Sequence, residues 1–290
     1  MRVGFTCPDG QNIKFADCLK SCRMGDRCAS EPTLHYLAQV RPWEGKTSPT
    51  MCFKGNLQNM LETLNDWYCT VDSMAFLLFG QNHHSLMDAA AKGGNWFSEE
   101  RIDDEEQRAT PDIFNETTLI DYKTYGSYKV MKVLGIRSID TPTGEVLKSG
   151  PRTGKPKTRK VKEQRDEWRD MHELIMQLNR YRVMVNKKLG YVITKLKCQI
   201  TVRDGGIMVA STRGITKNIY FLDVPIITND KVNTFFKAKD KEILEVINAG
   251  TCSTECTEEE RWDGIRCKRY CHVNHLCWFY QAGLEKEVEK

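Results

Sequence analysis

The sequence predicts a mixed α/β fold, in which a central mixed sheet is flanked by helices. Three observations predict it: helical patterns fill the first half of the chain, a strand pair lies in the middle, and a long helix with further strands follows. Elements in this order pack helices against a sheet. With 290 residues, the chain is long enough for one large domain or two small ones.

Apolar residues recur at helical spacing in several segments. The predicted helices cover residues 33–40, 56–68, 71–92, 164–188 and 229–248. Gly93-Gly94 and Gly190 are typical of helix ends. Strand patterns cover residues 109–114, 117–124, 191–203 and 218–224. Asn115-Glu116 between the first two strands predicts a tight turn, and therefore a hairpin.

Twelve cysteines include two sets of four with the same spacing, ten, three and five residues apart. The N-terminal frame is Cys7, Cys18, Cys22 and Cys28, and the C-terminal frame is Cys256, Cys267, Cys271 and Cys277. Four thiolates can hold Zn²⁺ or an iron–sulfur cluster, and spacing does not choose between them. Disulfides are a weaker alternative, as is one shared site made from one cysteine of the first frame and three of the second.

Other residues near the frames have simpler interpretations. Cys252 is a spare ligand, while His272 and His275 are solvated histidines that are also able to replace a sulfur. Cys52, Cys69 and Cys198 lie in apolar surroundings and are expected to be buried.

Composition and charge favour a cytoplasmic protein. Net charge is +4, and the first residues contain no apolar signal core. The longest apolar run, 74–79, is too short to span a bilayer, so no membrane partner is expected. Twelve cysteines in a reducing compartment favour metal ligands or buried thiols.

The hairpin carries the candidate chemistry. Asp121 and Lys123 are two residues apart in a strand and therefore share a face, and the turn brings Asp112 opposite them. Two carboxylates suit Mg²⁺ or Mn²⁺, and a lysine beside them can offset charge that builds on phosphorus. The simpler alternative is a solvated Asp–Lys pair.

Two helices add further candidates. His84 is a candidate metal ligand, Asp88 one turn later is placed to orient it, and His83 is a weaker candidate. On the long helix, Gln177 and Tyr181 share one face, although they also fit the polar border of its apolar stripe.

The order Gly80-x-x-x-His84, Pro111-Asp112, Asp121-Tyr122-Lys123 and Gln177-x-x-x-Tyr181 resembles the RecB-like branch of the PD-(D/E)XK nuclease superfamily. With cysteines at both ends, the chain is similar to CRISPR-associated RecB-like exonucleases and the AddB nuclease domain.

The resemblance implies a restriction-endonuclease-like fold and Mg²⁺- or Mn²⁺-dependent hydrolysis of DNA, as an exonuclease on single strands or DNA ends. His84, Asp112 and Asp121 would bind the metal, and Lys123 would be the catalytic lysine. It also implies that Gln177 and Tyr181 contact DNA and that a [4Fe-4S] cluster is held by one N-terminal cysteine and the triplet Cys267, Cys271, Cys277. The four N-terminal cysteines and the triplet's first gap of three residues depart from that pattern.

The expected organisation is a cysteine-rich region over 1–32, a nuclease core over 33–250 and a second cysteine-rich region over 251–290. A basic stretch, 148–165, is expected to begin as a loop or flexible arm that contacts DNA, with Arg180 and Arg182 supporting single-strand contacts.

Helicase, recombination or adaptation proteins are expected as partners. The competing function is a non-catalytic zinc-containing module that binds nucleic acid; an iron–sulfur redox carrier is weaker, because it leaves the carboxylate–lysine set without a role.

Overall fold

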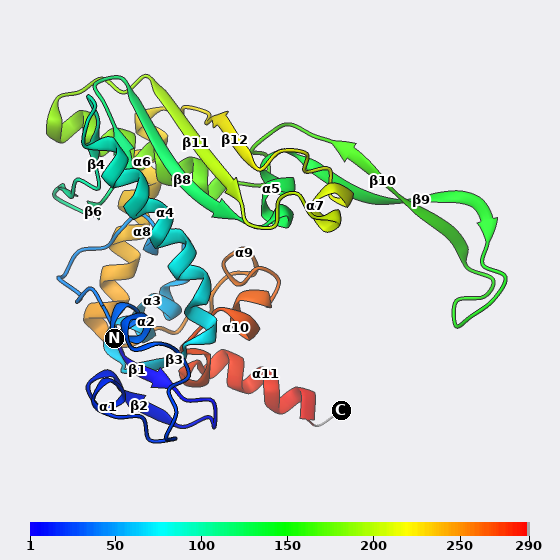
Figure 1. Cartoon of the computed structure of the whole chain (residues 1–290), viewed down its shortest axis with the longest axis horizontal. Coiled ribbons are helices and arrows are strands. Elements are labelled where there is room, and N and C mark those ends of the chain that lie inside the picture. Colours follow the sequence, from blue (N-terminus) through cyan, green and yellow to red (C-terminus); the bar gives the residue numbers. More distant parts are fainter. Residues whose placement is uncertain (289–290) are drawn as a thin grey trace.

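The computed structural model describes the backbone of residues 1–288 and the side chains of residues 1–284. Its body has two parts, one built on a five-stranded sheet and one on helices and a smaller sheet, and a long hairpin projects away from both (Figure 1). None of the described helices combines the length and apolar character needed to cross a bilayer.

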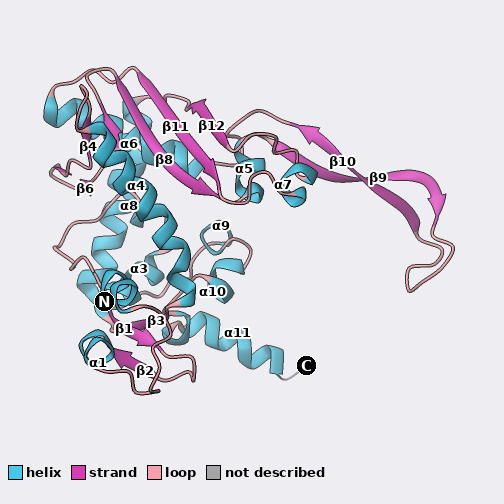
Figure 2. Ribbon diagram, viewed as in Figure 1, coloured by secondary structure: helices cyan, strands magenta, loops and turns pink. Residues whose placement is uncertain are grey.

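The main sheet has the strand order β12-β11-β8-β7-β4. These strands are β4 (Phe97–Ser98), β7 (Ile113–Phe114), β8 (Thr118–Tyr125), β11 (Lys195–Val202) and β12 (Ile219–Asp223). The central pair β8–β11 is parallel and the other pairs are antiparallel. The predicted class, a mixed α/β protein with a mixed sheet flanked by helices, is therefore confirmed (Figure 2).

Side chains alternate along the strands, so the sheet presents two faces, and a helix packs against each of them. Cys198 and Ile200 on β11 are fully buried and belong to the same core as Leu178 of α6 (His172–Leu189). The opposite face meets α4 (Ala75–Ala91), where His83 Nε2 lies 3.1 Å from Thr201 Oγ1 of β11. α4 and α6 therefore approach β8 from different sides.

The second part of the body begins with a three-stranded sheet of order β2-β1-β3. Its strands are β1 (Arg2–Thr6), β2 (Asn12–Lys14) and β3 (Trp67–Thr70), and the helices α1 (Phe15–Lys20) and α2 (Glu31–Leu37) lie beside it. Phe5, Leu34 and Cys69 form its core. Strands β1 and β2 lie in the cysteine-rich region, for which the sequence predicts no strand, and β3 follows a helix that ends four residues earlier than predicted, at Leu64 of α3 (Asn56–Leu64).

α3 packs against α8 (Asn229–Ala249), and Leu57, Phe236 and Ile243 are buried between them. The C-terminal region follows as short helices: α9 (Glu258–Arg261), α10 (Ile265–Arg269), the 3-10 turn η3 (Asn274–Leu276) and α11 (Trp278–Val288). Val273 is buried in the same core, which joins this region to α3 and α8.

The basic stretch is mostly strand, which corrects the expectation of a loop. β9 (Ile136–Val146) pairs with β10 (Pro156–Gln164) as an isolated antiparallel ribbon, called here the arm (residues 136–164). The two strands could not be predicted from the sequence, because both faces of the ribbon are mostly exposed and its residues show no alternation of apolar and polar side chains. α5 (Ser127–Val133) and α7 (Met208–Thr212) lie at its base (Figure 1).

Helix α6 starts at His172, eight residues after the predicted start. Trp168 adopts a φ of +66°, its side chain is 3% exposed, and its Nε1 donates to Asp223 O at 2.7 Å. The buried tryptophan thus turns the chain between the arm and the helix.

The short strands β5 (Ile102–Asp103) and β6 (Arg108–Ala109) hold a loop against α6. The loop's Asp104 and the helix's Arg180 are 3% and 2% exposed, and Arg180 Nη2 lies 2.7 Å from Asp104 Oδ2. Arg182 is also buried and donates to Ile227 O at 2.7 Å. The expectation that Arg180 and Arg182 contact DNA was wrong, because both guanidinium groups are used inside the protein.

Candidate functional site

The β7–β8 hairpin positions the predicted carboxylates. Ile113 pairs with Ile120 in its register, so Asp112 and Asp121 are the next residues outward from that pair, and they lie near enough for Asp112 to act electrostatically on Asp121. Asn115 N donates to Thr118 O at 2.9 Å. The tight turn is therefore centred on Glu116-Thr117, one residue later than predicted. Hairpin formation itself places the two aspartates together.

Asp121, which is buried, forms an ion pair with the half-buried Lys123. Lys123 Nζ lies 2.6 Å from Asp121 Oδ2, and the Asp121 side chain is 1% exposed. Burial raises the pKa of Asp121 above its usual range, with Lys123 acting in the opposite direction. Burial alone would lower the pKa of Lys123, but Asp121 and Asp112 raise it well above its ordinary value. The lysine is therefore a fixed cation beside two carboxylates.

A second cluster joins α4 to the start of the hairpin. His84 Nδ1 lies 3.2 Å from Asp112 Oδ1 and 3.5 Å from Glu99 Oε1. One ligand atom from each of the three side chains lies within 4.8 Å of the others, a separation that one divalent ion can bridge. The other Asp112 oxygen, Oδ2, accepts the Tyr122 N–H at 2.6 Å, which fixes the carboxylate.

The sequence did not single out Glu99, which lies in the acidic loop before the hairpin. Its backbone N–H donates to Asp112 O at 3.0 Å, and its φ of +50° lies in the left-handed region that residues other than glycine rarely adopt. This backbone conformation, fixed by a long-range contact, directs the carboxylate toward His84. Only the concentration of acidic residues in that loop could have signalled it.

Three sequence-predicted ligands have different outcomes. The structure brings His84 and Asp112 together and adds Glu99, whereas Asp121 is held by Lys123 instead of joining that group. Asp88 pairs with Lys92 at 3.5 Å, so the carboxylates beside His84 are those of Asp112 and Glu99.

Gln177 and Tyr181 occupy one face of α6 as predicted, and Gln177 Nε2 donates to Tyr181 Oη at 2.6 Å. The Tyr181 side chain is 7% exposed, and burial raises its pKa to about 12, with smaller electrostatic effects from Lys123, Asp121 and Asp112. The phenol is therefore neutral and lies near the ion pair on the α6 side of the sheet.

The contacts of His84 predict a pH dependence of stability in the metal-free protein. Hydrogen bonds to Asp112 and Glu99 raise the pKa of His84 to about 10. Because the folded pKa exceeds the unfolded value of about 6.5, the stabilisation is complete below about 6.5 and is lost as the pH rises to about 10.

Thermal unfolding in EDTA across that range is expected to show a falling melting temperature for the wild type and a smaller fall for His84→Gln. His35→Gln, which removes an exposed histidine 3.6 Å from Glu31, is the matched control and should follow the wild type. An equal alkaline loss in His84→Gln would contradict the assignment.

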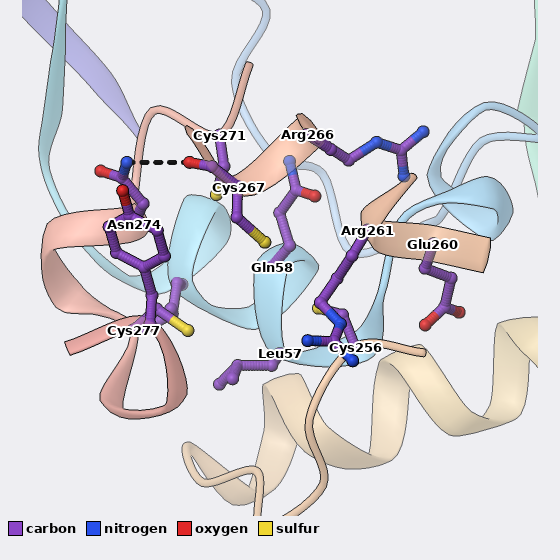
Figure 3. A pocket seen from close by; sticks show the side chains of 12 residues that line it. Leu57, Gln58, Cys256, Glu260, Arg261, Arg266, Cys267, Cys271, Asn274 and Cys277 are labelled. Atoms are coloured by element: carbon purple, nitrogen blue, oxygen red, sulfur yellow. Dashed lines mark hydrogen bonds between the residues drawn. The ribbon is translucent and has the colours of Figure 1, made fainter. Parts of the chain in front are cut away.

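The four cysteines of the C-terminal frame line one small cavity between α3 and the C-terminal helices, shown in Figure 3. Cys256 Sγ lies so close to Gly55 that a Cβ there would come within 2.2 Å of the sulfur. Arg261 and Arg266 also line the cavity. The N-terminal α3 backbone thus approaches the first cysteine, and two cations lie near the set.

The four cysteines of the N-terminal frame line a different cavity that shares no lining residue with the first. Each frame is therefore complete by itself, and the alternative of one site shared between the ends does not match this arrangement. His272 stacks on Trp67 at 5.1 Å between ring centroids, and His275 is exposed; neither lines a cysteine cavity. Cys52, Cys69 and Cys198 are buried, as predicted.

Among known proteins, no family model and no curated sequence matches this chain. A solved structure described as "Crystal structure of SSO0001" is similar to it, with 13% sequence identity, a TM-score of 0.41, and coverage of 85% of this chain and 91% of that chain.

Proposed function

We propose that the chain is a metal-dependent DNA nuclease that hydrolyses phosphodiester bonds, with a preference for single strands or DNA ends. One observation carries the proposal: a His84–Glu99–Asp112 group that can hold a divalent ion lies next to an ion pair between the buried Asp121 and the half-buried Lys123, and Asp112 belongs to the same hairpin as that pair. A solvated surface hairpin has no need of either arrangement, because burying charged groups costs free energy unless they are paired.

The proposed finer fold is that of the restriction-endonuclease-like PD-(D/E)XK enzymes. The mixed sheet, the hairpin with carboxylates on both strands, and the helices on its two faces support it. The matching motif positions also support it, because His84, Asp112, Asp121 and Lys123 lie together in space although up to 39 residues separate them in the sequence.

The residues fit Mg²⁺ or Mn²⁺, since the group offers two hard carboxylate oxygens and an imidazole. When bound, the ion would supply a water activated at neutral pH and would polarise a phosphate oxygen. His84, Asp112 and Glu99 would hold it, with Asp121 as a further carboxylate once the lysine releases it. Lys123, fixed as a cation, would orient the nucleophile and stabilise charge that develops on the phosphate.

Two adjoining cavities offer a surface for a single strand beside Gln177 and Tyr181, and neither is lined by His84, Asp112 or Lys123. They measure about 610 and 430 Å³, and Thr50, Lys54, Glu62 and Trp67 lie in the walls of both. Tyr181 lines the first and Gln177 the second. Aromatic side chains suited to base stacking are spread along the walls; they are Trp43, Trp67, Trp262 and Tyr270.

The arm offers a second surface for DNA. Between residues 136 and 164 the sequence has eight Lys or Arg against three Asp or Glu, so the arm alone exceeds the chain's net charge of +4. Its strands extend roughly 35 Å at about 3.3 Å per residue. A two-stranded ribbon fits the major groove of B-DNA, and its cations contact phosphates there.

Neutralising the arm is expected to weaken binding to duplex DNA and its salt dependence. Arg152, Lys155 and Arg159 are exposed, and among the described residues they make no ion pair. The triple Gln variant should lower the slope of log Kd against log salt by about 2–3, since each phosphate contact adds ~0.9.

Fluorescence anisotropy in EDTA measures this binding without cleavage. The matched control replaces Lys231, Lys237 and Lys241, three exposed lysines of α8, with Gln. It removes the same charge and should leave the slope within about 0.5 of the wild type, as expected if few phosphates are contacted there. Equal effects of the two triple variants would show that the arm is not the binding surface.

A non-catalytic zinc-containing module that binds nucleic acid is the competing function. The arm and the cysteine frames would serve it equally, but the Asp121–Lys123 pair would have no role. Labelled single- and double-stranded DNA incubated with Mg²⁺, Mn²⁺ or EDTA distinguishes the two functions: the nuclease cleaves only with a divalent ion, and the module cleaves under no condition.

A further inference from the structure

The two frames share their local structure around the second and third cysteines. Cys18 and Cys267 each lie two residues before the last residue of a short helix, α1 or α10. Cys22 and Cys271 each lie two residues after the end of that helix. The fourth cysteine of each set then precedes the next helix, α2 or α11. The shared spacing is therefore matched by a similar backbone path around the second and third cysteines, whereas β2 follows the first cysteine of one frame and α9 that of the other.

Hydrogen bonds repeat as well. The carbonyl oxygen of Cys22 accepts the N–H three residues later, from Gly25 at 3.3 Å, and that of Cys271 accepts the N–H three residues later, from Asn274 at 3.4 Å. In each frame the chain therefore makes a similar turn directly after the third cysteine. The second and third cysteines on either side of this segment line the same cavity in each frame.

All four N-terminal cysteines line one cavity of about 120 Å³, and none forms a disulfide. The cavity is also lined by Arg23 and Arg27, as the C-terminal cavity is lined by Arg261 and Arg266. Four thiolates around a doubly charged metal centre leave a net negative charge, which nearby guanidinium groups offset in part. Both cavities thus combine four thiols with two arginines and one carboxylate, Asp26 in the N-terminal cavity and Glu260 in the C-terminal one.

We infer that the N-terminal frame is a metal site in its own right, in which Cys7, Cys18, Cys22 and Cys28 hold one thiolate-bound centre of the same kind as the centre held by the C-terminal frame. The chain would then carry two equivalent centres, one at each end of the sequence. This inference does not depend on the nuclease activity. Zinc ions and iron–sulfur clusters share the required thiolate chemistry, and metal analysis distinguishes them.

The centre would fasten the N-terminal segment to its sheet. α1 has only six residues and contains no fully buried residue, and it is held by partly buried contacts such as that of Phe15 with Phe5. A bound metal would link the end of β1, through Cys7, to α1 and to the segment before α2. Metal binding would therefore be coupled to the folding of this region.

Metal analysis of the full-length protein, purified without oxygen, tests the inference. Cys22→Ser and Cys271→Ser alter the same position of the two frames, and each is expected to halve the zinc or iron content and to lose the same element. The double variant should retain neither zinc nor iron. Cys252→Ser is the matched control, because this partly exposed cysteine lies outside both frames, and it should keep the full content.

A measurement on the wild type avoids any folding defect of the variants. Thiol alkylation followed by peptide mass analysis should label the N-terminal frame slowly in the metal-loaded protein and rapidly after chelation, whereas Cys252 reacts in both states. Two results would overturn the inference: full metal content in Cys22→Ser, or loss of different elements from the two single variants. Rapid labelling of the N-terminal frame in loaded protein would overturn it as well.

Discussion

Replacing Lys123 with Ala is expected to lower the rate of DNA cleavage by about 10²–10⁴-fold, the range for removing a positioned proton donor or an electrostatic stabiliser. The Lys123 ammonium lies 2.6 Å from Asp121 and is held in its charged form by two carboxylates. Its removal takes away a cation fixed beside them, so less positive charge remains to stabilise the charge that develops on the phosphate. Labelled single-stranded DNA with saturating Mg²⁺ gives the rate.

Two comparisons make that result specific. Lys195→Ala changes an exposed lysine on β11, the strand paired with β8, and should cleave at the wild-type rate. Anisotropy in EDTA should show that Lys123→Ala binds DNA within about threefold of the wild type, because an interaction made mainly in the transition state contributes little to ground-state binding. Cleavage by Lys123→Ala within threefold of the wild type would reject Lys123 as the catalytic lysine.

The core of the candidate site was readable from the sequence because it is local. Asp112, Asp121 and Lys123 lie on one hairpin, so strand periodicity and a short turn were enough to predict that they converge. The position of His84 could not be predicted from local pattern, since its helix meets the hairpin only through tertiary packing. The resemblance to known nucleases was the reason to place His84 beside the carboxylates. Glu99 was missed because a backbone with positive φ in an irregular loop leaves no periodic signal.

In the fold, too, elements with a local sequence pattern were predicted and elements set by long-range contacts were not. The long helix α8 and the strands β8, β11 and β12 lie within a few residues of their predictions, because each has a buried face with regular spacing. The arm was missed as a strand pair because its exposed, charged residues carry no such pattern. β1 and β3 pair across more than sixty residues, and pairing of that range is set by the whole fold and cannot be read from either segment.

The burial of the two arginines of α6 could not be predicted from the sequence, for a different reason. Their neighbour Tyr181 and the basic arm upstream made DNA contact a reasonable hypothesis, yet the partner of Arg180 is Asp104, 76 residues away. A charged residue inside an amphipathic helix reveals little about whether an opposite charge will be buried beside it. The pairing instead depends on the β5–β6 loop, which packs on α6.

Replacing Arg180 with Met is expected to lower the free energy of unfolding by about 3–5 kcal/mol, because it leaves Asp104 buried without a counter-charge. Arg180 Nε also donates to Gln107 Oε1 at 2.8 Å, so the same change removes a hydrogen bond inside the core. Urea denaturation measures the loss. The control Lys187→Met breaks an exposed pair with Glu105, 2.6 Å apart, and should change stability by less than about 1 kcal/mol.

Combining Arg180→Met with Asp104→Asn removes both charges and should restore part of the stability, since the unpaired carboxylate is the main cost. A double variant less stable than Arg180→Met would show that hydrogen bonds to Asp104, and not its unpaired charge, dominate at this position.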